Sequence, residues 1–255
     1  MGTAQRNAML FPGGDYWQRV VRTAPANLIS YWPLWDASGT SVVNLASLRG
    51  MPAAVGIPAA ESSNVTLAQP GIGDGKTSML FVPTSSSYVN IYSAELASAF
   101  NGAEGTLMAW VKVANAAVWA DGSLDQIFVV ETDTGDSVFV YKDNAVAGRV
   151  FLAYKAGGTT EATSFTGLGG NIGWICFALT WSKAADRVYG YCNGIASTPS
   201  ATLGVWGGAV VASKVLLGTI DATLLTRLWS GSIAHVALWN TPLSAAQIAY
   251  LSRVR

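Results

Sequence analysis

Residues 174–192 read WICFALTWSKAADRVYGYC, and this stretch decides the fold. Two runs with strand composition, Trp174–Trp181 and Arg187–Cys192, flank the segment Lys183–Asp186. A connection of this length and composition is typical of a β-hairpin. The first run is apolar at nearly every position, which favours a strand that is covered on both faces. The stretch therefore predicts a hairpin inside a two-layer sandwich with one outer face also covered.

Similar short runs recur along the chain, separated by Gly, Asn, Asp, Ser and Pro, and we predict them as strands. They are Ile29–Leu34, Ser78–Val82, Tyr88–Ile91, Thr106–Val113, Gln126–Glu131, Ser137–Tyr141, Val150–Tyr154, Lys214–Thr219 and Gly231–Trp239. A second hairpin turn is predicted at Thr132–Asp136, and Gly50–Gly75 is predicted to be a long loop. Eleven short antiparallel strands in one chain predict an all-β sandwich of the jelly-roll kind.

Three short helices are predicted beside these strands. Ser244 and Gln247 have the spacing of a capping box, and the helix that they begin is predicted at Ala245–Val254. An N-terminal helix is predicted to run from Asp15 to about Arg22, and a third covers Ala94–Phe100.

Charge is sparse in this sequence. Its 255 residues include 15 basic and 15 acidic side chains, so the net charge is zero. Charged residues make up 12% of the chain, about half of the roughly 25% typical of soluble domains. The absence of a basic run argues against nucleic-acid binding. A surface with so little charge gives weak protection against association, so we expect burial in an assembly, with self-association as one form.

Membrane insertion and export are not expected from the apolar segments. No uncharged stretch approaches the roughly 20 predominantly apolar residues that a spanning helix needs. The N-terminal residues, MGTAQRNAMLFPGGDYW, contain no apolar run of signal-peptide length. We therefore expect no secretory signal.

Five motifs in order along the chain resemble laminin-G-like domains. They lie at Leu28–Thr40, Ser78–Val82 with Tyr88–Ile91, Gly105–Val113, Tyr191–Gly194 and Trp229–Ser244. The resemblance implies the concanavalin A-like sandwich that lectins, laminin-G domains and some glucanases share. It covers nearly the whole chain, so we expect an N-terminal arm and short helix at 1–27 and one sandwich domain at 28–255.

The N-terminal part narrows this resemblance. Tyr16–Pro25, followed by Tyr31-Trp32 and Asp36–Gly39, is similar to the version of the domain found in bacteriophage structural proteins. That similarity implies a virion component of the capsid surface, neck or tail, made in the host cytoplasm. The expected partners are other virion subunits. Three aromatic residues would dock the N-terminal arm on such a partner: Phe11, Tyr16 and Trp17.

Metal binding has little support. The family often carries an acidic pair after the isoleucine of its closing strand, where this chain has Ala234 and His235. An aspartate commonly follows the first strand, where Asn44 stands here. Calcium needs six to eight oxygen ligands, so these departures weaken the case for an inherited calcium site. One histidine and two cysteines without C-x-x-C spacing also do not make a zinc site, and we expect no cofactor.

Catalysis is not expected either. Glu131, Asp133 and Asp136 superficially resemble the acidic strand of related glucanases, whose retaining members hold two carboxyls about 5–5.5 Å apart. The intervening Thr132–Gly135 is a turn signal, however, and a turn breaks the alternation that would place two acids on one face. His235, the single histidine, lies inside a predicted strand and is expected to be structural.

Cys176 and Cys192 lie on the two arms of the hairpin. Reduced thiols are the default for a protein made in a cytoplasm. A disulfide stays open as the alternative, because a slip of one residue in register decides whether the two side chains share a face.

Three tryptophans, Trp119, Trp206 and Trp229, lie in or beside Gly- and Ala-rich loops. Exposed aromatic rings there would stack on sugars or anchor a partner, and Asp121 would supply a polar acceptor beside Trp119. The alternative is that these rings pack inside the domain or at subunit contacts.

The leading interpretation is a non-enzymatic structural or decoration subunit of a phage-like particle that contacts host glycans at its rim. The alternative is a free-standing carbohydrate-binding lectin. A glycoside hydrolase is the third possibility and needs a second carboxylate facing Glu131 across a cleft.

Overall fold

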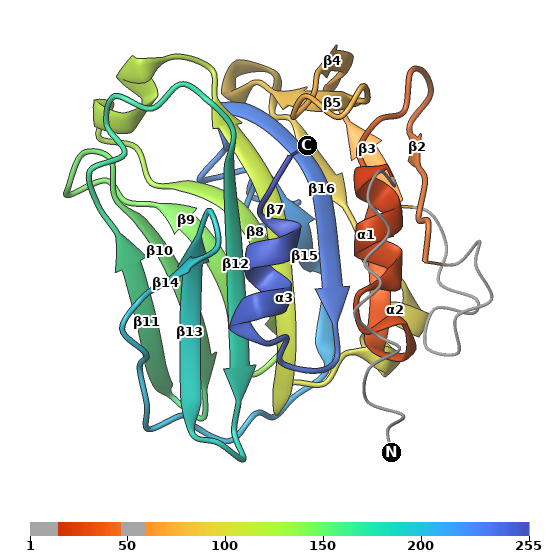
Figure 1. Cartoon of the computed structure of the whole chain (residues 1–255). Helices are drawn as coiled ribbons and strands as arrows, with labels where there is room; N and C mark the ends of the chain where they lie inside the picture. Colours follow the sequence, from red (N-terminus) through yellow and green to blue (C-terminus); the bar gives the residue numbers. More distant parts are fainter. Residues whose placement is uncertain (1–14, 47–59, 255) are drawn as a thin grey trace.

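The computed structural model describes residues 15–46 and 60–254, and within them two eight-stranded antiparallel sheets make up most of the fold (Figure 1). Three helices accompany the sheets: α1 (Tyr16–Arg22), α2 (Ala94–Ala99) and α3 (Ala245–Leu251). In order across sheet A lie β14 (Ile195–Ala196), β13 (Arg187–Cys192), β12 (Ile175–Ser182), β7 (Glu104–Val113), β16 (Gly231–Trp239), β5 (Thr77–Phe81) and β4 (Thr66–Pro70), with β1 (Leu28–Trp32) also paired to β16. Across sheet B lie β11 (Thr159–Phe165), β10 (Val150–Ala156), β9 (Ser137–Lys142), β8 (Asp125–Thr132), β15 (Val210–Leu217), β6 (Tyr88–Asn90), β3 (Ala60–Ser63) and β2 (Ser41–Val42).

The predicted sandwich, its eleven strands and both hairpins are confirmed. Ser182 pairs with Arg187 across the first hairpin, and Glu131 pairs with Ser137 across the second. The turn at Thr132–Asp136 closes with a backbone hydrogen bond of 2.9 Å from the Thr132 N–H to the Asp136 carbonyl. Local turn chemistry was therefore sufficient to place these two connections.

The predicted loop at Gly50–Gly75 is wrong for its second half, because β3 and β4 form there. Residues 50–59 lie outside the described part of the chain. The strands β2, β11 and β14 were also missed. These missed strands are short or rich in Ser, Thr and Ala, and they lie at or near sheet edges, where one-sided burial leaves little apolar pattern to detect.

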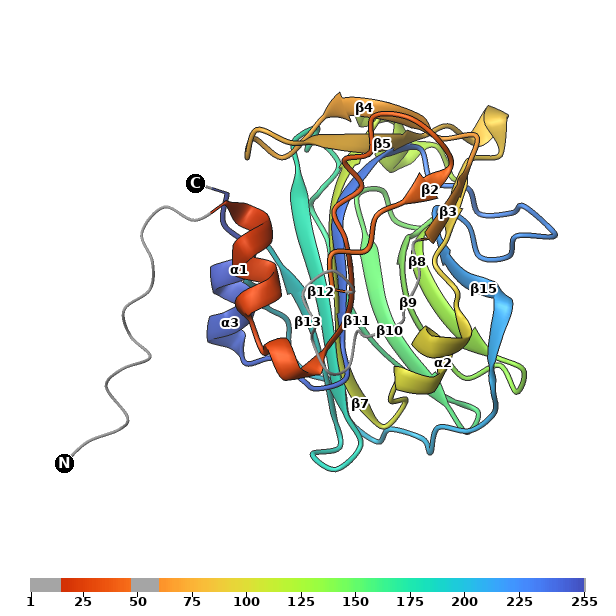
Figure 2. The same cartoon turned by 90° about the vertical axis from the view of Figure 1, so that its right-hand side faces the viewer.

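The main core lies between the two sheets (Figure 2). Its largest fully buried side chains include Trp32, Phe81, Phe128, Phe177 and Trp181. The alternation of side chains along each strand sends one set inward and leaves the other set for the outer face of its sheet. The outer faces of the two sheets differ in what covers them, and this difference decides which face can hold the candidate site.

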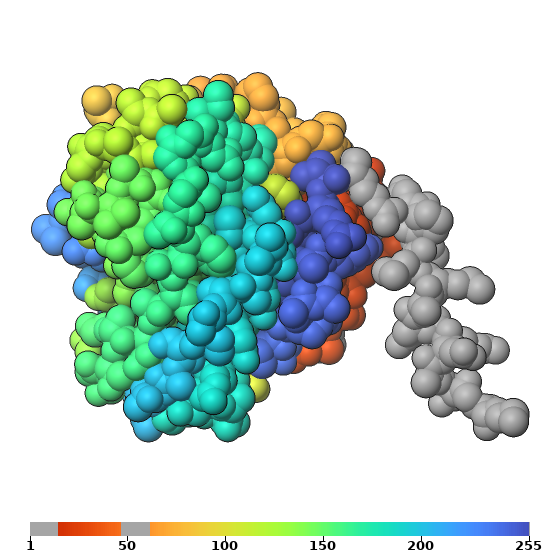
Figure 3. Space-filling model, turned by 60° about the vertical axis from the view of Figure 1, so that its left-hand side comes forward, coloured from red at the N-terminus to blue at the C-terminus, as the bar shows by residue number. Residues whose placement is uncertain are grey.

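The outer face of sheet A is covered by α1 and α3, which pack side by side on it (Figures 1 and 2). Figure 3 shows α3 in dark blue between the cyan strands and the red α1. The Tyr16 side chain of α1 is 2% exposed. Its hydroxyl donates to the Leu251 carbonyl (2.9 Å) and accepts from Trp110 Nε1 (2.7 Å).

This packing corrects the prediction that Tyr16 docks an arm on another subunit, whereas docking by Trp17 stays a prediction. Tyr16 is buried in its own domain, and Trp17 packs in part against the same apolar cluster. The physical reason is that sheet A presents an apolar outer face that needs a cover, and the amphipathic α1 supplies part of it. Phe11, the third predicted residue of the arm, lies outside the described residues.

The capping box of α3 is confirmed, since the Ser244 hydroxyl accepts from the Gln247 N–H and the Gln247 side chain accepts from the Ser244 N–H. The helix ends at Leu251, three residues before the predicted end. None of the helices in the described ranges is long and apolar enough to cross a membrane.

The register of the hairpin separates the two cysteines. Cys192 pairs with Phe177, so it is offset by one residue from Cys176. Cys176 lies with the helices on the outer face of sheet A, whereas Cys192 packs against the core between the sheets. Both thiols are free, because an offset of one residue turns the side chains to opposite faces.

Candidate functional site

Sheet B carries a row of aromatic side chains on its outer face. Neither α1 nor α3 covers this face (Figure 2). Tyr141 and Phe139 lie on β9, and Phe151 lies opposite Tyr141 on β10. The ring centroids of Phe139 and Tyr141 are 5.7 Å apart, and those of Tyr141 and Phe151 are 5.3 Å apart, both stacked. The rings are half-buried, so the face offers a continuous aromatic surface to solvent.

Charged side chains border this row. The Arg149 guanidinium lies over the Phe151 ring, 4.7 Å from its centroid, and donates from Nε to Asp143 Oδ2 (2.8 Å). Beyond the other end of the row, Lys214 pairs with Glu131. Burial and the nearby Asp143 carboxylate raise the pKa of Tyr141, which keeps its hydroxyl protonated as a hydrogen-bond donor.

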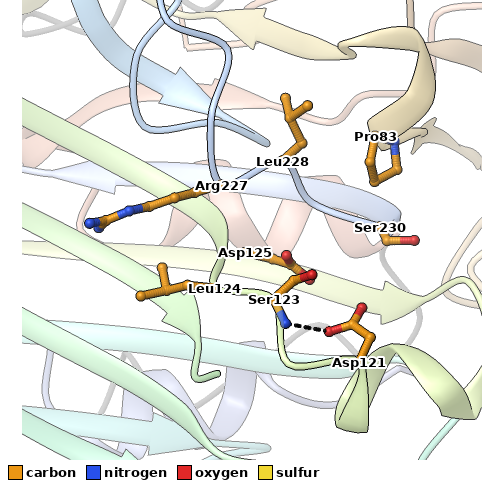
Figure 4. A pocket seen from close by; sticks show the side chains of 8 residues that line it. All are labelled: Pro83, Asp121, Ser123, Leu124, Asp125, Arg227, Leu228 and Ser230. Carbon is orange, nitrogen blue, oxygen red and sulfur yellow. Dashed lines mark hydrogen bonds between the residues drawn. The ribbon is translucent and has the colours of Figure 1, made fainter. Parts of the chain in front are cut away.

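A surface pocket of about 580 Å³ opens at the rim, where the chain enters β8 and β16 (Figure 4). Its lining comes from three connections and combines acidic, basic, hydroxyl and apolar groups: Pro83, Asp121, Ser123, Leu124, Asp125, Arg227, Leu228 and Ser230. Such a mixture suits a ligand with both apolar and hydroxylated surfaces.

A buried ammonium supports the acidic side of this pocket. The Lys142 side chain is fully buried at the end of β9. Its Nζ donates to Asp121 Oδ1 (2.7 Å) and to the Ser123 carbonyl (2.7 Å), and it lies 3.3 Å from Asp125 Oδ2. Asp121 stays one-third exposed, whereas Asp125 is buried. The ammonium thus neutralises part of the charge of two carboxylates that line the pocket.

Asp125 is the buried carboxylate of the pair. Its Oδ2 is buried and makes an ion-pair contact with Lys142, but it has no hydrogen-bond partner among the described residues. Burial raises the pKa of Asp125 to about 6, against the opposing charge of Lys142 and with a contribution from Asp121. The ion pair with Lys142 offsets part of the cost of burying this carboxylate, and Asp121, which is one-third exposed, is the carboxylate that a ligand can reach.

Arg227 connects the pocket to the aromatic row. It lines the pocket, and in Figure 4 its side chain extends past Leu124, away from Pro83 and Ser230. Its charge also lowers the pKa of Tyr141, although burial outweighs that effect. The Arg227 carbonyl also accepts from the N–H of Gln126, the residue paired with Tyr141. The pocket and the row are therefore neighbours, and we name them together the sheet B site: the row Phe139, Tyr141 and Phe151 with the rim pocket.

The oxygen donors of the pocket do not fit a calcium ion. Calcium takes six to eight oxygen ligands, whereas Asp121, Asp125 and the Ser123 carbonyl face the Lys142 ammonium. No group of three or more His, Cys, Asp or Glu side chains in the described ranges could hold a metal ion.

The chain matches the family model described as concanavalin A-like lectin/glucanases superfamily, of the laminin G type, over residues 83–249. This match covers more than half of the sequence and includes the strands that carry the sheet B site. The chain belongs to the concanavalin A-like lectin/glucanase superfamily. No curated protein sequence matches it.

Solved structures show the same fold at low sequence identity. The receptor-binding domain of botulinum neurotoxin mosaic serotype C/D superposes with a TM-score of 0.64 at 11% identity, over 89% of this chain and 50% of that one. Trypanosoma rangeli sialidase superposes with a TM-score of 0.61 at 13% identity, over 89% of this chain and 33% of that one. This chain thus spans a third to half of the length of these solved structures.

Two of the predicted loop tryptophans are buried in this domain, so the prediction that their rings are exposed was wrong. Trp119 is 1% exposed and donates from Nε1 to the Asn171 carbonyl (2.6 Å), and Trp229 is 0% exposed. Both belong to the core between the sheets. Loop segments at the ends of a sandwich fold over its interior, and large rings fill the space that they close.

Trp206 and Asp121 have different positions. Trp206 is half-buried and packs on the rings of Phe100 and Tyr154, with centroid distances of 5.4 and 5.8 Å. It is absent from the pocket lining, so binding at Trp206 stays a prediction. Asp121 does line the rim pocket, but its partner is Lys142 and not a tryptophan ring.

The residues that the sequence analysis missed are Tyr141, Phe151, Lys142 and Arg227. A usable signal was present in β9 (SVFVYK), where Phe139 and Tyr141 alternate with valines and end at a lysine. Because valines and aromatic residues alternate along β9, both faces of this strand are apolar. The pattern does not show which of the two faces lies outward.

His235, expected to be structural, is fully buried in a bulge of β16 with φ 49°. Its Nδ1 is 2.6 Å from the Tyr31 hydroxyl, and its Nε2 is 3.1 Å from Asp74 Oδ2. Burial lowers the pKa of His235 despite the opposing effect of Asp74. The imidazole therefore joins β1, β16 and the β4–β5 connection away from the sheet B site.

Asp125→Asn is expected to remove a pH dependence of folding stability. The carboxyl titrates near about 3.9 in the unfolded chain, and its pKa in the fold is raised to about 6. Between these values the folded state binds more protons, so stability falls as pH rises. Relative to the variant, the native protein should lose up to about 3 kcal/mol of unfolding free energy across this window.

Urea denaturation of both proteins at several pH values between about 3.5 and 7 measures this effect. Subtracting the unfolding free energy of one protein from that of the other cancels the contributions of the carboxyl groups that both proteins contain. Parallel pH dependences would show that Asp125 titrates normally in the fold.

Proposed function

We propose that this chain is a non-enzymatic glycan-binding domain and that the sheet B site holds the glycan. The observation that carries the proposal is the row of stacked, half-exposed aromatic rings that continues into a polar pocket on an outer sheet face. Sheet A has its outer face covered by helices, so sheet B is the face available to a large, flat ligand.

The chemistry of the site matches that of a sugar chain. Sugar rings have apolar C–H faces that pack on aromatic rings, and hydroxyl groups at their edges that need polar partners. The row Phe139, Tyr141 and Phe151 offers the apolar surface. The Tyr141 hydroxyl and the Asp121 carboxylate offer polar partners at its border.

The carboxylates of this face are occupied in ways that do not suit glycoside hydrolysis. Glu131 pairs with Lys214, and Asp136 accepts backbone N–H groups of Gly157 (2.9 Å) and Gly207 (2.7 Å). Asp133 likewise accepts from the Ala209 N–H (2.9 Å). A retaining mechanism needs one free carboxylate nucleophile and a second carboxyl about 5–5.5 Å away. These acids support turns and the pairing of charge instead.

Tyr141→Ala is expected to weaken glycan binding at least tenfold, about 1.4 kcal/mol, because it removes the central ring of the row. A glycan array with the native chain identifies a ligand, and titration calorimetry with that ligand compares the variants. Phe151→Ala is expected to act in the same direction.

Tyr189→Ala is the matched control, since Tyr189 is a half-buried tyrosine on sheet A. It should leave the affinity unchanged. Loss of binding with the control but not with Tyr141→Ala would place the glycan elsewhere. No binding by the native chain to any glycan would count against the proposed function.

A second candidate role is that of a structural subunit of a phage-like particle, in which the same domain contacts neighbouring subunits. It is favoured by the 12% content of charged residues and zero net charge, together with exposed apolar side chains at Ile172, Ile195, Val205 and Leu224. Sedimentation of the isolated chain over a range of concentrations tests it. Concentration-dependent association supports the role, and a monomer at every concentration argues against it.

A further inference from the structure

The rim pocket is electrically polarised. Its acidic side carries Asp121 and Asp125, whose charges face the buried Lys142 ammonium. Its other side carries Arg227, whose guanidinium has no hydrogen bond or ion pair with a described residue. A ligand that fills the pocket therefore meets hydrogen-bond acceptors at one end and a free cationic donor group at the other.

The neighbouring cations of the open face differ from Arg227. Arg149 is bound to Asp143, and Lys214 is bound to Glu131. Each of these two cations at the border of the aromatic row is therefore already paired with a carboxylate. Arg227 lines the pocket, and its carbonyl accepts from the N–H of Gln126, the residue paired with Tyr141, so it is the cation nearest to a ligand that extends from the pocket toward the row.

The loop that carries Arg227 is held in one conformation. The Thr219 hydroxyl donates to the Thr226 carbonyl (2.7 Å), and the Gln126 N–H donates to the Arg227 carbonyl (2.7 Å). Arg227 itself has φ 57°, in the left-handed region that residues other than glycine rarely adopt. Strained backbone of this kind persists where surrounding contacts determine it, and it often marks a functional position.

From this geometry we infer that the glycan is acidic: Arg227 binds an anionic group of a sugar while Asp121, whose side chain is one-third exposed, accepts a hydroxyl of the same ligand. A guanidinium binds planar carboxylates through two parallel N–H bonds, which is stronger than a neutral hydrogen bond. The ring of the acidic sugar lies at the border of Tyr141. The inference rests on the proposed function, since it names the class of glycan that the sheet B site takes.

Matched pairs of oligosaccharides test the inference. In each pair one member carries a carboxylate that the other lacks: glucuronate against glucose, galacturonate against galactose, and sialylated against asialo lactosamine. The native chain is expected to bind the acidic member of its preferred pair about tenfold or more tightly. Raising the salt concentration to about 1 M should reduce that preference, because the Debye length falls to about 3 Å.

Arg227→Gln is expected to abolish the preference for the acidic member, so that both members of a pair bind with equal affinity. The control is Arg187→Gln, which removes the same charge from an exposed position on sheet A and should leave the preference intact. Thermal unfolding of both variants checks that the fold is retained.

Two results would overturn the inference while the proposed function stands. One is equal binding of acidic and neutral members by the native chain. The other is an equal loss for both members in Arg227→Gln, which would mean that the arginine does not select the anion. Silence of the native chain toward all probes would instead contradict the proposed function and remove the basis of the inference.

Discussion

Lys142→Met is expected to lower the free energy of unfolding by about 3–5 kcal/mol, the usual cost of breaking a buried ion pair by removing one partner. The ammonium is fully buried between Asp121, Asp125 and the Ser123 carbonyl. Methionine fills a similar volume, so the loss comes from charge and not from packing. Asp125, which is buried, would lose its compensating cation. Urea denaturation at pH 7 measures the change.

A double-mutant cycle with Asp125→Asn separates this effect from general damage. The double variant should be more stable than the sum of the two single changes implies, by at least about 1 kcal/mol, because the uncompensated charge is gone. Lys155→Met is the matched control on the neighbouring strand β10, where the lysine is half-exposed, and it should cost about 0.5 kcal/mol or less. Equal costs for Lys142 and Lys155 would show that the buried cluster is unimportant.

Trp119→Ala is expected to destabilise the domain by about 3–5 kcal/mol, as do other truncations of buried aromatic residues. The ring is 1% exposed and belongs to the core between the sheets. Its Nε1 also donates to the Asn171 carbonyl. Chemical denaturation with far-UV circular dichroism measures the loss.

Trp119→Phe serves as the companion variant, because it keeps most of the apolar volume and removes the hydrogen bond. It should cost about 1–3 kcal/mol, the penalty for a buried carbonyl without its donor. If Trp119→Ala kept full stability but lost glycan binding, the ring would be a stacking surface after all, contrary to its burial.

These two predictions affect how binding experiments on this domain are interpreted. A variant of Trp119 or Trp229 that loses binding will also have lost part of its core, so it carries no information about the site. Variants of Tyr141 and Arg227 alter side chains that reach solvent. The Tyr141 variant tests the apolar part of the proposed contact, and the Arg227 variant tests its polar part.

Much of the fold could be predicted because its signals are local. The hairpin turn at Lys183–Asp186, the alternation within strands and the capping box at Ser244 each depend on residues close in sequence. The strands at the sheet edges escaped detection for the opposite reason. β11 (TTEATSF) buries one side chain well, Thr163, and its pairing with β10 comes from backbone hydrogen bonds that any sequence can form.

The candidate site could be predicted only in part. Asp121 was identified and does line the pocket, but the expected tryptophan partner is buried. The composition of a loop describes only the residues of that loop. The burial of a tryptophan ring depends on all the residues that pack against it, including those far away in the sequence. The sequence could therefore show that large rings are present near the rim without showing where they lie.

By itself, the sequence determined a two-layer antiparallel sandwich with capped short helices, since turns, alternation and caps act over a few residues. The sequence also indicated one covered outer face, but the tertiary structure alone decided that α1 and α3 cover sheet A and that neither of them covers sheet B. It also decided that Lys142 pairs with Asp121 and Asp125, and that the Arg227 backbone bonds to Gln126, the residue paired with Tyr141. The reason is that these contacts join strands and loops far apart in sequence, and their register and layer stacking are properties of the whole assembled fold.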